Sequence, residues 1–199
     1  MSSRDLILDR VRRHHPAAVE APAIPDFDRP LPDPLAAFGA ALARMGGQVV
    51  DPPARGSLDT FLYDRYPHAR VICSATTEVR GTRRIADVQQ PQELDDVDVG
   101  VVRAAFGVAE TGSVFLSDNE FGVNALGFLS QHLVVLLDPR AIVTNLHLAY
   151  RHRGFLEARY AVFMTGPSAT ADIEGVLVRG AQGIRTLTVI PLELPRSTA

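Results

Sequence analysis

The segment from His132 to Leu137 constrains the fold most, because Leu133 to Leu137 is an unbroken apolar run of the length of a strand. A strand that is apolar on both faces must be covered on both faces, as strands in parallel sheets are. Val71-Ile72-Cys73 and Gly112 to Ser117 have the same character, and helix-forming segments alternate with the strands. The sequence therefore predicts an α/β fold with a mainly parallel sheet flanked by helices on both faces.

The folded body begins at Asp33-Pro34, since an Asp cap followed by proline at the first helical position is a common helix start. We predict a helix there that buries Phe38 and Leu42 and ends at Gly46-Gly47. A short strand at residues 48–50 and a helix from Ser57 to Tyr66 follow. Residues 33–194 are expected to form one α/β domain.

Residues 1–32 are expected to form a helical arm and a proline-rich linker. Ser3 is a candidate cap for a short helix that ends at His14-His15-Pro16, and its apolar residues recur at helical spacing. The segment after it contains six prolines between residues 16 and 34 and too little apolar surface to fold alone. The arm therefore needs a packing partner elsewhere, and a homodimer is one arrangement that would supply it.

Four further elements complete the expected domain. Asp138-Pro139 repeats the cap and proline and predicts a helix through Tyr150. A strand is expected from Tyr160 to Thr165, a helix from the turn at Gly166 to about Arg179, and a closing strand at residues 185–190. The acidic stretch at residues 93–98 is typical of a solvated loop or helix face.

Charge and cysteine content exclude several functions. The net charge of −3 gives no strong attraction to nucleic acid or to an anionic membrane. No apolar run approaches the ~20 residues of a membrane-spanning helix, and the first residues do not resemble a signal peptide, so a cytoplasmic protein is expected. The single cysteine, Cys73, cannot form an intramolecular disulfide or supply a four-cysteine site, and we expect no metal site or cofactor within this chain.

The turn after the strand at residues 160–165 is the first candidate site, because ligands of open parallel sheets bind where strands turn into helices. Gly166 and Pro167 precede two hydroxyl groups, those of Ser168 and Thr170. Asp172 and Glu174 in the expected first helical turn would repel a phosphate. Ordinary helix capping remains open, as does a site for a neutral hydroxylated ligand, a cation or a ribose, with Glu174 as a supporting residue.

Glu110 is the second candidate, in the turn before the strand at residues 112–117. A carboxylate beside Gly112 at the edge of a buried sheet could act as a general base or a nucleophile, with Thr111, Gly112 and Ser113 contacting a ligand. A simple turn in which Glu110 bonds to nearby backbone is an equal alternative. For a single functional site, the corners at residues 110–113 and 166–170 must converge on one accessible cavity.

The remaining candidates have supporting roles. His147 and Arg151 share a helix face, and His147 is typical of a surface or interface position. His132 opens a strand and is expected to be partly buried, which favours a supporting hydrogen bond over proton transfer. Cys73 ends a buried strand and could act as a nucleophile, although a buried free cysteine usually behaves as a small hydrophobic residue.

Four segments of the chain form a distinctive ordered set. They are Phe106 to Val114, Phe128 to Val135, Ile142 to Tyr150, and the block Thr165-Gly166-Pro167-Ser168-Ala169-Thr170-Ala171-Asp172-Ile173-Glu174. Together they resemble the LUD-domain proteins, and in particular the LutC/YkgG family of lactate-utilisation proteins. The resemblance implies a fold similar to the NagB/RpiA/coenzyme A transferase-like superfamily. It also implies a role in oxidising L-lactate to pyruvate alongside two iron–sulfur partner proteins, which would carry the clusters.

The chain departs from the family pattern at three positions. Asn124, Ala169 and Gln182 stand where relatives often carry Arg, Lys or Arg, and His, respectively. These substitutions leave fewer positive charges for a carboxylate substrate, although Arg103, Arg179 and Arg185 could compensate.

Two functional hypotheses follow. In the first, the chain is an accessory, non-redox subunit of a lactate-oxidising system that works with iron–sulfur proteins. In the second, the chain is a stand-alone enzyme on a small sugar-phosphate or acyl-coenzyme A substrate, with Glu110 as base or nucleophile. The second hypothesis rests on analogy of fold alone.

Overall fold

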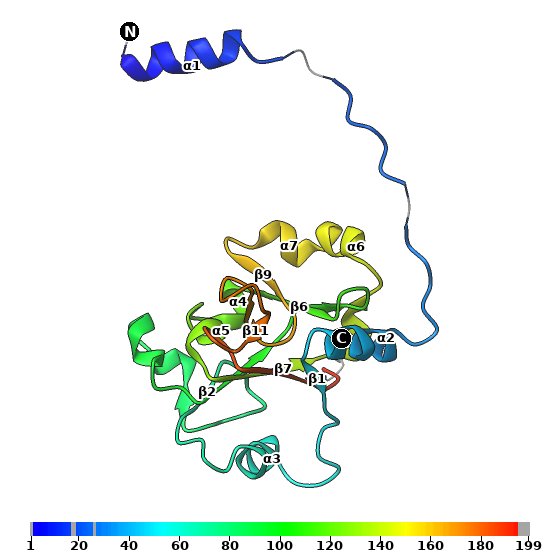
Figure 1. The fold of residues 1–199 in the computed structure, drawn as a ribbon, viewed down its shortest axis with the longest axis vertical. Coiled ribbons are helices and arrows are strands. Elements are labelled where there is room, and N and C mark those ends of the chain that lie inside the picture. Colours follow the sequence, from blue (N-terminus) through cyan, green and yellow to red (C-terminus); the bar gives the residue numbers. More distant parts are fainter. Residues whose placement is uncertain (1, 17–18, 26, 195–199) are drawn as a thin grey trace, which may run out of the picture.

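A six-stranded sheet forms the centre of the computed structural model, which describes residues 2–16, 19–25 and 27–194 (Figure 1). Its order is β1-β12-β7-β4-β2-β3, and every neighbouring pair is parallel. In that order the strands are Gln48–Val49, Thr186–Pro191, His132–Leu137, Val99–Arg103, Ile72–Ser74 and Arg83–Arg84. The predicted α/β class with a mainly parallel sheet is confirmed.

Strand β4 lies between β7 and β2 and is missing from the elements identified in the sequence. Four of its five residues are buried, and Val99, Val101 and Val102 are completely so. The acidic stretch at residues 93–98, just before β4, is not only exposed to solvent, because one of its carboxylates accepts hydrogen bonds from the backbone. Asp98 Oδ2 accepts hydrogen bonds from the backbone N–H groups of Arg70 and Val71 at 2.7 and 3.0 Å.

Helices cover both faces of this sheet. On one face α3 (Leu58–Arg65) packs through Leu62 against alternate residues of β4 and β7. On the other face lie α2 (Pro34–Arg44), α4 (Asp118–Phe121) and α5 (Leu126–Leu129), with Phe38 and Leu42 completely buried against β7 and β12. Asp33 caps α2 as expected, since its Oδ1 accepts from the N–H of Ala36 at 2.9 Å.

A second sheet of four strands covers part of the α2 face, which the sequence did not predict. Its order is β8-β5-β6-β9, where β6 is antiparallel to both neighbours. These strands are Ile142–Val143, Phe106–Val108, Ser113–Ser117 and Ala161–Met164. The strands expected at residues 112–117 and 160–165 therefore exist but belong to this mixed sheet, whose outer face is covered by α6 (Leu146–Arg151) and α7 (Arg153–Glu157).

The prediction of a single helix from Asp138-Pro139 to Tyr150 is wrong. Asp138 does cap, accepting from the N–H of Arg140 at 2.9 Å, but the helix is a 3₁₀ turn of Pro139–Ala141. The chain then extends into β8, because Ile142 and Val143 pair with Gly107 and Val108 of β5. Sheet pairing thus splits the segment, and Asn145 caps the separate helix α6. Two more 3₁₀ turns, Ile85–Asp87 and Pro91–Leu94, follow β3.

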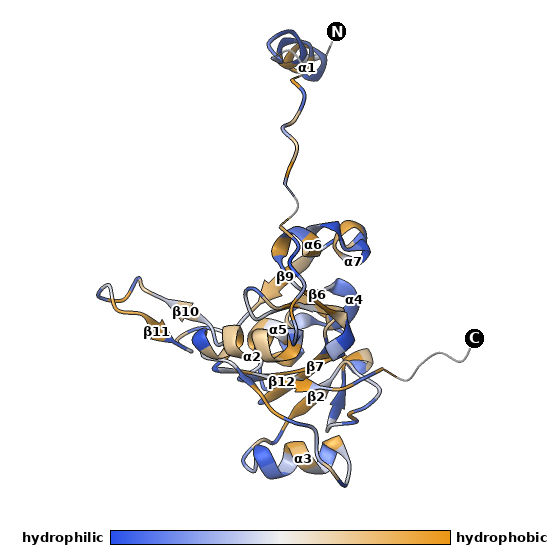
Figure 2. Ribbon diagram, turned by 90° about the vertical axis from the view of Figure 1, so that its right-hand side faces the viewer, coloured by the Kyte–Doolittle hydropathy of each residue, from blue (hydrophilic) through white to orange (hydrophobic). Residues whose placement is uncertain are grey.

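The N-terminal helix α1 (Ser3–Arg13) has no buried residue and stands away from the body at the end of an extended segment (Figures 1 and 2). Its cap is Ser2 rather than the expected Ser3. Ser2 Oγ accepts from the N–H of Asp5 at 3.2 Å, and the Asp5 carboxylate accepts from the N–H of Ser2. Within the described ranges of the chain, none of the helices has the length and apolar character needed to cross a membrane.

Candidate functional site

Glu110 lies in the turn between β5 and β6, and its side chain is exposed. Its Oε2 accepts a hydrogen bond from the backbone N–H of Leu146, at 3.0 Å, at the start of α6. Its Oε1 has no hydrogen-bond partner among the described residues. Glu110 therefore helps to cap a helix with one oxygen and can present the other to a ligand.

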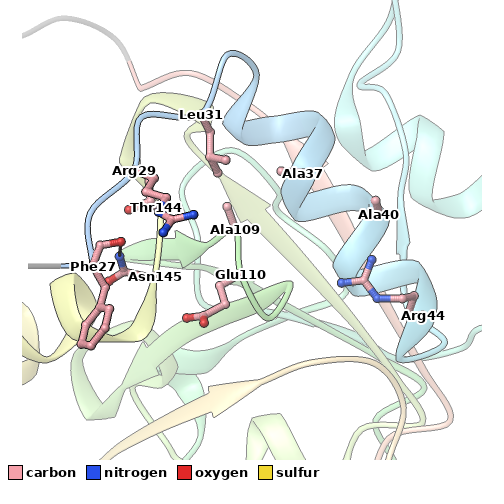
Figure 3. Close-up of a pocket in the computed structure, with 10 residues that line it drawn as sticks. All are labelled: Phe27, Arg29, Leu31, Ala37, Ala40, Arg44, Ala109, Glu110, Thr144 and Asn145. Atoms are coloured by element: carbon pink, nitrogen blue, oxygen red, sulfur yellow. Dashed lines mark hydrogen bonds between the residues drawn. The ribbon is translucent and has the colours of Figure 1, made fainter.

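A cavity of about 400 Å³ opens beside Glu110 (Figure 3). The guanidinium groups of Arg29 and Arg44 point into it from opposite sides in Figure 3, and Arg44 comes from the last turn of α2. The other lining residues are Phe27, Leu31, Ala37, Ala40, Ala109, Thr144 and Asn145. Two cations, one carboxylate and neighbouring polar groups suit a small anion that also carries a hydroxyl group.

Residues 27–31 of the predicted linker form one wall of this Glu110 cavity. The ring of Phe27 stacks on His147 with 4.8 Å between ring centroids. Thr144 Oγ1 donates to Asp28 Oδ1 at 2.6 Å, and Asn145 Nδ2 donates to the carbonyl of Phe27 at 3.3 Å. This stretch is therefore docked on the body, unlike α1.

Thr111, Gly112 and Ser113 face the interior rather than the Glu110 cavity. Gly112 is buried with φ at 65°, and an added Cβ would lie 2.1 Å from the backbone nitrogen of Leu42 in α2. Ser113 is 5% exposed, and the buried Oγ1 of Thr111 has no hydrogen-bond partner in the described chain. The corner thus serves close packing of β6 against α2, and ligand contact by these three residues stays a prediction.

The helix expected after Gly166 is replaced by a hairpin of β10 (Ala169–Thr170) and β11 (Val178–Arg179), which projects from the body in Figure 2. Ser168 pairs with other segments, since its N–H donates to the carbonyl of Ile184 at 2.9 Å. Glu174 and Gly175 have φ of 55° and 68°, which no helix permits. Ala169, Ala171 and Glu174 favour a helix locally, but the turn and the pairing of β10 with β11 outweigh this local preference.

Thr170 and Asp172, one hydroxyl and one acid of this hairpin, bond to each other. Thr170 Oγ1 donates to Asp172 Oδ2 at 3.2 Å and accepts from the N–H of Asp172 at 3.3 Å. Glu174 is exposed at the hairpin turn. Pro167 and Ser168 instead line a separate groove of about 290 Å³ with Phe128 and Ile184.

The two glycine-bearing corners are neighbours but do not share a cavity. Thr165 Oγ1 donates to the carbonyl of Thr111 at 3.4 Å, so the corners touch. The C-terminal end of α2 fills the space beside them, since an added Cβ on Gly166 would lie 2.3 Å from the carbonyl oxygen of Met45. The expected single cavity is therefore replaced by two, one at Glu110 and one at Ser168.

The two histidines singled out in the sequence have different surroundings in the fold. His147 is exposed on α6 beside Phe27. His132 begins β7 at the amino ends of the parallel strands, is half-buried, and pairs its Nδ1 with Thr186 Oγ1 at 2.8 Å. The partial burial expected of His132 is observed, and its supporting role in a functional site stays a prediction.

The positive charges nearest Glu110 are not those anticipated. Arg103 is paired with Glu78, Arg179 lies against Gly46, and Arg185 lines a different cavity. Ala169 and Gln182 are exposed, and Asn124 has a buried Oδ1 with no partner in the described chain. Arg29 and Arg44 were missed because nothing in the sequence relates them to Glu110.

A third place with polar chemistry is the carboxyl edge of the parallel sheet. A cavity of about 300 Å³ there is lined by Ala75, Arg103, Ala104, Ala105, Asn119, Glu120 and Leu194. Arg103 Nε donates to Glu78 Oε1 at 2.8 Å, and its Nη1 donates to the carbonyl of Leu192. Val99, Val101 and Val102 are the sequence signal for β4, which would have placed Arg103 at this edge.

Cys73 is completely buried, and this burial raises the pKa of its thiol to about 11. We therefore expect a thiol reagent such as DTNB to label the native protein at pH 8 roughly a hundredfold more slowly than the denatured protein. Equal rates would show that Cys73 is accessible as a thiolate. Among residues 2–16, 19–25 and 27–194, no three His, Cys, Asp or Glu side chains are grouped so that they could hold a metal ion.

Comparison with known proteins gives a family match over most of the body. Residues 59–191 match the model of the LUD domain. Two proteins named lactate utilization protein C, from Geobacillus thermodenitrificans (strain NG80-2) and Geobacillus kaustophilus (strain HTA426), are each 29% identical over 160 residues. Each alignment covers 75% of this chain and 61% of the relative, so the chain spans less than two thirds of the length of these relatives.

A solved structure shares the fold. It is the crystal structure of a DUF162 family protein from Deinococcus radiodurans, with a TM-score of 0.60 and 19% sequence identity. The match covers 81% of this chain and 99% of that one. The arrangement of the sheet and its helices is therefore one already seen in a natural protein.

Proposed function

This chain belongs to the LUD domain family, and from that membership we propose that it takes part in lactate utilisation, as an accessory, non-redox subunit of a system that oxidises L-lactate to pyruvate. The observation that carries the proposal is the match over residues 59–191 together with similarity to two proteins named lactate utilization protein C.

In this proposal iron–sulfur partner proteins carry the electrons. Oxidation of lactate to pyruvate releases two electrons and two protons, and a redox centre must accept the electrons. A cluster held by four cysteines does not fit the residues of this chain, because its single thiol is buried and burial raises the pKa of that thiol. We assign to this chain the binding of substrate and the assembly of the site with a partner.

The Glu110 cavity is the place that we assign to the substrate. Arg29 and Arg44 supply positive charge for a carboxylate, and Glu110 supplies an acceptor for a hydroxyl group. The alternative, an enzyme that uses Glu110 as base or nucleophile, is less well supported, because Glu110 already bonds to the N–H of Leu146.

Reconstitution tests the proposal. Lactate oxidation by the iron–sulfur partner proteins should increase severalfold when this chain is added, and the partners should co-purify with it. Full activity of the partners without the chain would contradict the accessory role.

Two substitutions test where the substrate binds. Replacing Arg44 with Gln should raise the lactate concentration needed for half-maximal activity by roughly tenfold, because a charged hydrogen-bond donor is lost. Arg151→Gln, at an exposed arginine on α6, is the matched control and should leave activity unchanged. Glu110→Gln should retain most activity, since Gln can still accept from Leu146, whereas loss of all turnover would favour the enzyme alternative.

A further inference from the structure

Another charged cavity, beside the end of α3, lies at the amino ends of the parallel strands and shares no lining residue with the Glu110 cavity. Its volume is about 280 Å³. The lining residues come from the end of α3 and the loop after it, and from the starts of β4, β7 and β12, and they include Arg65, Tyr66, Asp98, His132 and Arg185.

The charges in this amino-edge cavity do not balance. Arg65 and Arg185 carry two positive charges, and neither guanidinium group has a hydrogen bond or an ion pair within the described part of the chain. The acid that faces them is Asp98, and its Oδ2 is already held by the backbone N–H groups of Arg70 and Val71. The cavity therefore offers guanidinium donors with an excess of positive charge.

His132 adds a neutral donor to the same cavity. Burial, and secondarily the positive charge of Arg185, lower the pKa of His132, while Asp98 acts weakly in the opposite direction. The imidazole is therefore uncharged at neutral pH. Its Nδ1 pairs with Thr186 Oγ1, and when that hydroxyl donates, Nε2 carries the hydrogen. Tyr66 packs on the ring with 5.1 Å between centroids, which fixes its orientation.

We propose that this amino-edge cavity binds the phosphate group of a small phosphorylated metabolite through Arg65, Arg185 and His132. A carboxylate has one negative charge, which leaves one of the two guanidinium charges unbalanced even where its two oxygens accept from several donors. A phosphate monoester has up to two charges and three terminal oxygens, which match these donors. The site is distinct from the proposed lactate site, so it does not depend on that function.

Titration of the full chain with inorganic phosphate, followed by NMR of the histidine rings, tests the proposal. Phosphate should bind saturably and raise the pKa of His132, because a bound anion favours the imidazolium. His14 and His15, which follow α1, and His147 of α6 should not respond. Arg65→Gln and Arg185→Gln should each weaken phosphate binding by roughly tenfold or more. Arg151→Gln, at an exposed arginine on α6, is the control and should not weaken it.

The same titration with acetate at matched ionic strength shows whether the cavity prefers a phosphate to a carboxylate. The proposal is overturned if phosphate fails to shift His132, if acetate does so at lower concentration than phosphate, or if the Arg65 and Arg185 variants bind phosphate like the wild type. Circular dichroism and thermal melting of each variant show whether the fold is retained, so a misfolded variant is not counted as a loss of binding. His132→Gln identifies the resonance and should also weaken binding.

Discussion

Replacing Gly112 with alanine is expected to destabilise the fold by at least about 3 kcal/mol, and we expect much less of the variant than of the wild type to accumulate as folded protein. Two costs combine. A left-handed conformation, here φ at 65°, costs a residue with a Cβ about 1–2 kcal/mol. The new methyl group would also lie 2.1 Å from the backbone nitrogen of Leu42, so β6 and α2 would have to separate.

Gly175→Ala is the matched control for this prediction. Gly175 has nearly the same φ, 68°, but nothing lies within 4 Å of an added Cβ. The Gly175→Ala variant should therefore lose only about 1–2 kcal/mol of unfolding free energy, which is the cost of the left-handed conformation. Urea denaturation followed by circular dichroism gives both values. Equal losses would mean that the approach of β6 to α2 is not as close as described.

Replacing Arg103 with methionine is expected to cost about 2 kcal/mol at pH 7, since it leaves Glu78 without its partner in a partly buried place. The two side chains are 17% and 25% exposed, which puts the effect below that of a fully buried pair. Burial tends to raise the pKa of Glu78, but hydrogen bonds from its own backbone and from Arg103 outweigh it and lower the pKa below the usual value.

The sign of the pH effect follows from this lowered pKa. The stabilisation is present above the ordinary pKa of a glutamate and is lost as the pH falls through the folded-state pKa. The difference in unfolding free energy between wild type and Arg103→Met should therefore shrink between pH 5 and pH 3. Arg153→Met, which removes an exposed pair with Glu157, should change stability little at either pH. A difference for Arg103→Met that does not depend on pH would contradict the ion-pair explanation.

The parts of the fold that were predictable are those encoded locally. Asp33-Pro34 marks the start of α2, and the apolar run after His132 marks β7, because a cap or an unbroken apolar run needs no distant partner. The prediction of a helix after Gly166 was wrong, because pairing of β10 with β11 and the turn at Glu174 determine the backbone conformation there. Local preference favoured a helix there, and tertiary pairing prevailed.

The candidate site was predictable only in part. Glu110 was identified from its position in a glycine-bearing turn, and it does line a cavity. Arg29 and Arg44, which accompany it, lie in a proline-rich segment and at a helix end, where arginine is ordinary. Their approach to Glu110 depends on how residues 27–31 and α2 pack on the second sheet, and the spacing of residues in one sequence does not encode that distance.

The docking of Phe27 and Asp28 couples the arm to the Glu110 cavity. A molecule that occupies the cavity contacts a wall that is also the root of the arm, so it binds more tightly when that wall is in place. Reciprocity then requires that a bound molecule stabilises the docked state of residues 27–31 by the same free energy by which docking strengthens its binding. Release of this segment from the body would therefore weaken binding in the cavity without any change to Glu110 or Arg44.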